Sequence, residues 1–131
     1  MKQRYVMLGI VLLAFATLIS CDSSQTGGGS KKSGTGADAA LTAPPSSAAR
    51  MENDEGVGHY QQGHWDVAEG HFRKALMADQ NSAVAHYNLA LTLDKMGKHE
   101  EATASFKKAL ELASNDPAIK DSEILKKHLK M

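Results

Sequence analysis

Residues 100–112, with the sequence EEATASFKKALEL, decide the fold of this chain. Ala102, Phe106 and Ala109 follow one another at steps of four and three residues, so their side chains share one face of an α-helix. The two alanines are small enough to let a neighbouring helix approach closely. The ring of Phe106 is large enough to fill the space that remains between the helices. We therefore expect a helix here that packs through this face.

The same pattern occurs 34 residues earlier in the chain. When the sequence is aligned with itself at that offset, seven pairs of identical residues fall between positions 63 and 81. These pairs are Gly63/Gly97, Ala68/Ala102, Phe72/Phe106, Lys74/Lys108, Ala75/Ala109, Leu76/Leu110 and Asn81/Asn115. A period of this length is typical of stacked repeats, in which each unit buries its apolar face against the next.

A second helix is expected to precede this one in each unit. In residues 83–96, AVAHYNLALTLDKM, the apolar residues Ala85, Leu89 and Leu93 recur every four residues, which again places them on one helical face. Gly97 follows at the position where a residue in the left-handed conformation commonly ends a helix. Each unit is therefore expected to be two antiparallel helices joined by a tight turn.

The second unit resembles the tetratricopeptide repeat family. Its matching residues, at the spacings of that family, are Asn88, Leu89, Ala90, Gly97, Ala102, Phe106 and Ala109. The resemblance implies an all-α domain over residues 47–131, a short α-solenoid with repeats at 49–82 and 83–116. The first helix of the first repeat is the weaker one, because Glu55 stands where leucine is usual and Gly56 and Gly58 each cost about 1 kcal/mol against alanine.

A capping helix over residues 116–130 is expected to close the stack. Asn115 or Asp116 can cap its start, and Pro117 suits its first turn. Its expected buried stripe is formed by Ala118, Ser122, Leu125 and Leu129.

The resemblance also implies a groove for an extended peptide or a partner helix. The helix positions that line it are expected to be Asn53, Asp54, Val57, Tyr60, Gln61, Val84, Tyr87, Asn88, Leu91, Asp94 and Lys95. Tyr60 and Tyr87 would offer apolar area with a polar tip, which suits recognition. The alternative is that these are ordinary solvated helix positions. Capture of a C-terminal carboxylate is not expected, because only Asn88 matches the residues that one family subtype uses for it.

The N-terminus is typical of a sorting signal. Lys2 and Arg4 precede an uncharged, apolar run at residues 5–19, which is shorter than the roughly 20 residues that span a bilayer. The run ends in Leu18-Ile19-Ser20-Cys21, which resembles the lipobox of bacterial lipoproteins. The resemblance implies that residues 1–20 are removed and that Cys21 becomes the lipidated N-terminus. The alternatives are a buried free thiol and an ordinary secreted protein.

Asp22 follows the lipidated cysteine directly. Aspartate at this position resembles the signal that retains lipoproteins in the inner membrane of enteric bacteria, so the periplasmic face of the inner membrane is favoured over the outer membrane. Asp22 can also be an ordinary polar linker residue. Residues 21–46 are expected to be a disordered linker rich in Gly, Ser, Ala and Pro, because Leu41 is the one large apolar residue after Cys21 in this segment.

Few residues suggest chemistry. The formal net charge of zero gives no reason to expect a nucleic-acid partner. The six histidines have no recognised metal-ligand spacing, so we expect neither a metal nor another cofactor. His86 and His99 are expected to pack, because the family often has aromatic residues there.

The favoured function is therefore a non-enzymatic module that is tethered to the membrane of a bacterial envelope by lipid and binds or assembles an unidentified envelope protein or peptide. The alternative is a structural subunit of an envelope assembly that self-associates as a homo-oligomer.

Overall fold

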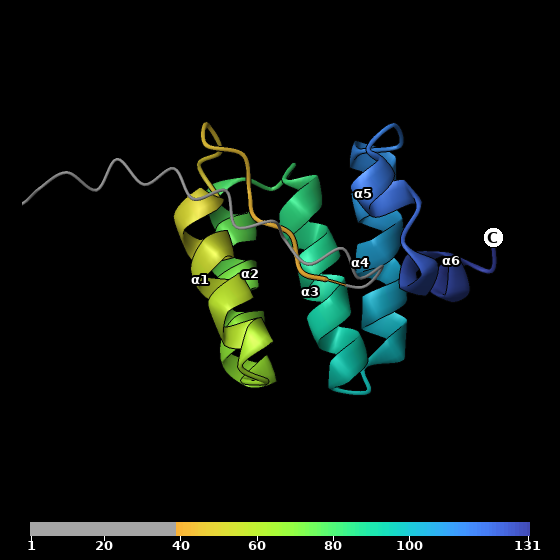
Figure 1. The fold of residues 1–131 in the computed structure, drawn as a ribbon, viewed down its shortest axis with the longest axis horizontal. Coiled ribbons are helices and arrows are strands. Elements are labelled where there is room, and N and C mark those ends of the chain that lie inside the picture. Colours follow the sequence, from red (N-terminus) through yellow and green to blue (C-terminus); the bar gives the residue numbers. More distant parts are fainter. Residues whose placement is uncertain (1–38) are drawn as a thin grey trace, which may run out of the picture. The chain divides into compact units, whose positions relative to one another are not determined.

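The computed structural model describes residues 39–131, which contain six helices and no strand (Figure 1). The helices are α1 (Arg50–Gln61), α2 (Trp65–Ala78), α3 (Ala83–Lys95), α4 (His99–Leu112), α5 (Pro117–Lys120) and α6 (Glu123–Leu129). Helices α1 and α2 form one antiparallel pair, α3 and α4 form a second, and α2 packs against α3 to join the pairs. The expected all-α, solenoid-like fold is thus confirmed for these residues.

The helix face that the sequence singled out forms the core. Phe106 and Phe72 have no exposed surface, and neither have the alanines beside them on α4 and α2. Phe106 also contacts the ring of Tyr87 edge to face, with 5.7 Å between ring centroids. The small and large side chains of this face therefore interlock as their spacing predicts.

Both turns between paired helices are built around a glycine with positive φ. Gly63 has φ +79° and Gly97 has φ +76°, a conformation that glycine adopts without the strain other residues incur. The backbone N–H of Gly97 donates to the carbonyl of Asp94, and that of Lys98 donates to the carbonyl of Leu93. These bonds satisfy the last carbonyls of α3 and fix the position at which α4 begins.

Charged side chains hold the two pairs in register. Lys98 Nζ lies 2.9 Å from Glu69 Oε2, and Arg73 pairs with both Glu69 and Glu101, at 2.7 and 3.2 Å. The hydrogen bond from Lys98 lowers the pKa of Glu69, whereas burial raises it, and Arg73 adds to the lowering. This network connects α2 to the first turn of α4.

The C-terminal cap differs from the sequence prediction. The expected single helix over 116–130 is two short helices, α5 and α6, that meet at Ser122. Ser122 has an extended backbone, and its Oγ accepts a hydrogen bond from Leu125 N–H, so it begins a new helix instead of continuing the old one. Because of this break Ile119, and not Ala118, is buried against the core. Asp116 caps α5, with Pro117 in its first turn, as expected.

Replacing each of two glycines of α1 by alanine is expected to change the stability of the fold in opposite directions. A Cβ atom at Gly56 would lie 2.6 Å from Cε1 of Phe72, whereas one at Gly58 would meet nothing within 4 Å. Gly56→Ala should therefore overpack the core and destabilise the fold by about 1–3 kcal/mol. Gly58→Ala should stabilise it by about 0.5–1 kcal/mol, because alanine is the better helix residue. Denaturant unfolding of both variants checks this, and equal shifts in the same direction would contradict the packing.

Candidate functional site

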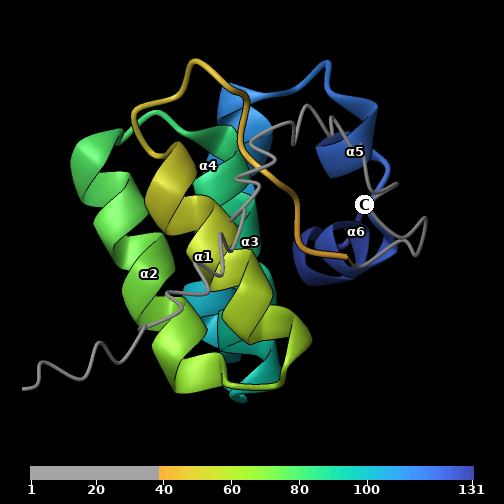
Figure 2. The ribbon, with the colours of Figure 1, turned by 60° about the vertical axis from the view of Figure 1, so that its left-hand side comes forward.

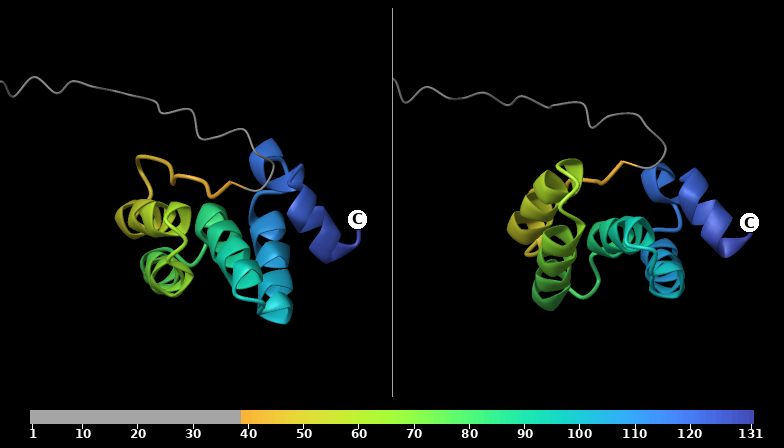
Figure 3. Two further views of the ribbon diagram at one scale, coloured as in Figure 1. Left: turned by 60° about the horizontal axis from the view of Figure 1, so that its bottom comes forward. Right: turned by 90° about the horizontal axis from the view of Figure 1, so that it is seen from below.

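The segment that precedes α1 packs against α1 and α3, over the positions expected to line a groove, and these positions are called the groove below. Figures 1 and 3 show residues 39–49 crossing α3 on the way to the start of α1. The N–H of Leu41 donates to Asn88 Oδ1 at 2.7 Å, and Asn88 Nδ2 donates to the Leu41 carbonyl at 2.6 Å. One side-chain amide therefore pairs with both main-chain groups of Leu41, as a neighbouring β-strand would.

A second asparagine completes this contact from the first repeat. Asn53 Nδ2 donates to the Leu41 carbonyl at 2.9 Å, and Asn53 Oδ1 accepts from Asn88 Nδ2 at 2.9 Å. Both asparagine side chains have no exposed surface. Their amides fix each other's orientation, so the groove presents a preset donor and acceptor to a peptide main chain.

Asp54 binds the same segment two residues further on. Its Oδ1 accepts the N–H of Ala43 at 3.1 Å, while Oδ2 is 3.4 Å from Arg50 Nε. Asp54 and Asn88 are 34 residues apart and so occupy the same position in their repeats. An extended chain turns every second residue to the same side. Two N–H groups that are two residues apart, those of Leu41 and Ala43, are thus bound by the same position of the two repeats.

The side chains of the bound segment are small where they enter the groove. Ala40 is 5% exposed and Ala43 is 6% exposed. Ala40 belongs to the same apolar cluster as Val57, Tyr60 and Leu91, and Leu41 packs against that cluster while half-buried. The alanines allow the main chain to come within hydrogen-bond distance of the asparagines.

The prediction of a disordered linker through residue 46 is wrong for its last residues. Residues 39–43 hold buried alanines and hydrogen bonds to both repeats. The sequence argument counted only large apolar side chains, whereas here the groove binds the main chain itself.

The other residues that were expected to line the groove differ in how far they are exposed to solvent. Val57 and Leu91 are buried, Val84 and Asp94 are half-buried, and Gln61 and Lys95 are exposed. Tyr60 is 9% exposed and Tyr87 is 1% exposed, so neither offers the open surface expected of it. The Tyr87 hydroxyl donates to Ser122 Oγ at 2.9 Å, which fixes it to the cap. Cys21 and Asp22 lie outside the described residues.

Asp94 lies at the end of α3 and contacts two histidines, His99 and His128. Burial raises the pKa of Asp94, but His128 and His99 in their protonated form, through hydrogen bonds and charge, outweigh burial and hold the pKa below its usual value. His99 is exposed, which contradicts the expectation that it packs. No spacing in the sequence indicates this cluster, because its members are separated by 5 and 29 residues and come from different helices.

Comparison with known proteins identifies one repeat. The family model described as tetratricopeptide repeat matches residues 83–116, which are α3, α4 and the turn after them. No curated protein matches the chain, and neither does any solved structure. Within residues 39–131, no helix is long and apolar enough to cross a membrane. Residues 83–116 are therefore a tetratricopeptide repeat, of the kind that mediates protein–protein interaction.

Proposed function

We propose that this tetratricopeptide-repeat chain is a non-catalytic interaction module of the bacterial envelope whose groove binds an extended peptide. The observation that carries the proposal is the pairing of Asn88 with both the N–H and the carbonyl of Leu41. Nothing in this contact depends on the side chain of residue 41. The groove therefore recognises the conformation of a peptide more than its sequence, as in recognition by strand addition.

The chemistry of the ligand follows from the residues in the groove. Positions that correspond to Ala40 and Ala43 must be small, because both side chains are almost completely buried. A moderately large apolar residue between them fits the place of the half-buried Leu41. A partner segment that satisfies these conditions competes with residues 39–43 for the same hydrogen bonds. Partner binding would then release the end of the linker.

A peptide that copies residues 38–46, DAALTAPPS, tests this proposal. The full chain, purified in detergent, is compared with a double variant, Ala40→Glu and Ala43→Glu, whose own segment cannot enter the groove. The labelled peptide should bind the double variant and should bind the wild type much more weakly. Adding Asn88→Leu to the double variant should abolish binding. Thr42→Glu is the matched control, because Thr42 is exposed within the same segment. Equal peptide binding with and without Asn88 would defeat the proposal.

The membrane tether is a separate part of the proposal and rests on the lipobox at residues 18–21. Two or three acyl chains on Cys21 would anchor the chain stably, since each buried methylene contributes about 0.8 kcal/mol. Cys21→Ser should abolish labelling by a fatty-acid analogue and leave either an uncleaved precursor or a released protein. Equal labelling of the serine variant would contradict lipidation.

We place the anchored protein at the periplasmic face of the inner membrane, on the argument from Asp22. Separation of the two membranes on a density gradient tests this, with Asp22→Ser compared with the wild type. Wild-type protein in the outer-membrane fraction would overturn it.

Self-association is the second candidate, because the occupant of the groove belongs to the chain itself. Residues 39–43 of one copy could fill the groove of another. The turn that returns the segment to α1, with Ser47 N–H donating to the Pro44 carbonyl at 3.0 Å, favours binding within one chain. A mass that rises with protein concentration in light scattering would favour exchange between copies instead.

A further inference from the structure

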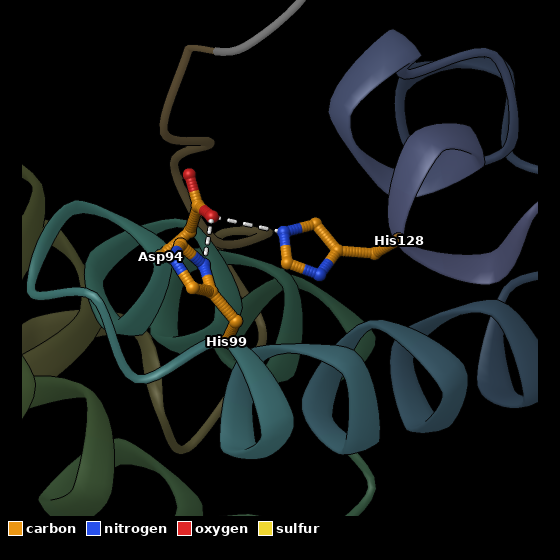
Figure 4. Close-up of side chains that lie close together, drawn as sticks. All are labelled: Asp94, His99 and His128. Atoms are coloured by element: carbon orange, nitrogen blue, oxygen red, sulfur yellow. Dashed lines mark hydrogen bonds and ion pairs between the residues drawn. The ribbon is translucent and has the colours of Figure 1, made fainter.

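A cluster of nitrogen and oxygen ligands joins the cap to the second repeat. Asp94 Oδ1 lies 2.9 Å from His99 Nδ1 and 2.9 Å from His128 Nε2. The three side chains come from α3, α4 and α6 and converge on one point (Figure 4). All three ligand atoms lie within 4.8 Å of one another. Two imidazole nitrogens and a carboxylate oxygen are a ligand set that suits Zn²⁺ and related transition metals.

The contacts of Thr103 favour one tautomer of His128. Its hydroxyl donates its single hydrogen to the carbonyl of His99, at 2.8 Å. The hydroxyl oxygen is 2.9 Å from His128 Nδ1 and therefore accepts a hydrogen bond from it. In the neutral ring, Nε2 then carries a lone pair and faces the carboxylate of Asp94 at 2.9 Å. Two lone pairs at this distance repel each other unless a cation lies between them.

The surroundings of the cluster hold the ligands in place and leave one side open. The ring of Phe106 lies 5.1 Å from that of His128, whose side chain is only 10% exposed. The side chain of His99 is 67% exposed and borders a cavity of about 320 Å³, which Asp94, His128 and Lys127 also line. Lys127 is an exposed residue, so its ammonium group can remain in water away from a bound ion. Water can occupy the open side as a further ligand.

We propose that Asp94, His99 and His128 bind a divalent transition-metal ion of the Zn²⁺ class, which fastens the capping helix α6 to the turn between α3 and α4. Thr103 is a positioning residue, because it accepts the Nδ1–H of His128 and so directs the Nε2 lone pair to the ion. Helix α6 lies at the end of the stack that is opposite α1 and α2 (Figure 2), so the ion would fasten the C-terminal end of the stack.

A second cluster of possible metal ligands lies in the first repeat, and the experiment must distinguish binding there from binding at Asp94, His99 and His128. Glu52 and Glu55 both approach Nδ1 of His71, at 2.8 and 3.4 Å. This cluster holds one imidazole against two carboxylates. With one nitrogen ligand instead of two it is the poorer ligand set for zinc, and His71→Gln is the matched control.

The test uses the full chain in detergent at pH 8. Titration with Co²⁺ is followed by visible absorption, which reports nitrogen ligands. Thermal unfolding is measured with and without Zn²⁺. The wild type and His71→Gln should both develop the Co²⁺ band and melt at higher temperature with Zn²⁺. His128→Gln should lose both responses. His99→Gln should weaken binding at least tenfold, and because His99 is exposed this variant keeps its fold. Thr103→Val should weaken binding by about 10–100-fold.

Mg²⁺ should have no effect on either readout, because it prefers oxygen ligands. No Co²⁺ band in the wild type, or a band that His71→Gln removes and His99→Gln leaves unchanged, would overturn the proposal. So would stabilisation by mild acid with no response to either metal, because a proton would then be the cation between His128 and Asp94.

Discussion

Phe106→Ala lowers the free energy of unfolding by about 3–5 kcal/mol, the range typical of a large aromatic residue truncated in a core. Phe106 has no exposed surface, and its ring contacts Tyr87 of α3 and His128 of α6. The cavity would therefore open where the second repeat meets the cap. With two repeats and a cap, the fold has little stability to lose. Denaturant unfolding followed by circular dichroism measures the change.

Met77→Ala is the control for this prediction. Met77 is also a large apolar residue on a helix of the stack, but it is 82% exposed. Its truncation should change the free energy of unfolding by less than about 0.5 kcal/mol. Similar losses in the two variants would mean that the face of α4 defined by Ala102, Phe106 and Ala109 is not the core.

Asn88→Leu is expected to release residues 39–43 from the groove and to cost about 2–4 kcal/mol. The side chain keeps nearly the same volume, so the loss comes from hydrogen bonds and not from a cavity. The Leu41 N–H and Asn53 Oδ1 each lose a partner, and an unpaired polar group in a buried place costs about 1–3 kcal/mol. The loss in free energy of unfolding is smaller than the sum of these costs, because the released segment can form hydrogen bonds with water. Thermal and denaturant unfolding give the magnitude.

Gln61→Leu is the matched control, because Gln61 was expected to line the same groove but its side chain is exposed. We expect a change within about 0.5 kcal/mol. A loss in the Asn88 variant no larger than in this control would show that the asparagine contributes little to holding the segment.

The sequence predicted the features of the fold that follow from local spacing. The buried face of α4 could be inferred from the steps between Ala102, Phe106 and Ala109, because a helix has a fixed period. The turn at Gly97 could be inferred as well, since its positive φ favours glycine. Both features also occur 34 residues earlier in the chain, so each prediction rests on two copies of the pattern.

Features that depend on a partner elsewhere in the fold could not be predicted in this way. The sequence predicts that Gly56 weakens α1, whereas its missing Cβ makes room for the ring of Phe72 across the helix pair. Ser122 was placed on a continuous helical stripe, but its side chain caps α6 and accepts the Tyr87 hydroxyl. Phe72 and Tyr87 lie 16 and 35 residues from Gly56 and Ser122, and such distant partners cannot be inferred from the period of a helix.

The candidate groove was predicted in part. Asn53, Asp54 and Asn88 were among its expected residues and form hydrogen bonds with the main chain of Leu41 and Ala43, whereas binding of a separate peptide stays a prediction. The identity of that chain was missed, because Ala40 and Ala43 have little hydrophobic area and gave the segment the composition of a flexible linker.

Amide hydrogen exchange at Leu41 tests most directly whether the groove binds a main chain through its asparagines. The measurement uses NMR on the uniformly ¹⁵N-labelled full chain in detergent. The Leu41 amide should exchange much more slowly than that of its exposed neighbour Thr42, and Asn88→Leu should remove this difference while the amides of α4 remain protected. A Leu41 amide that exchanges as fast as Thr42 in the wild type would contradict the account.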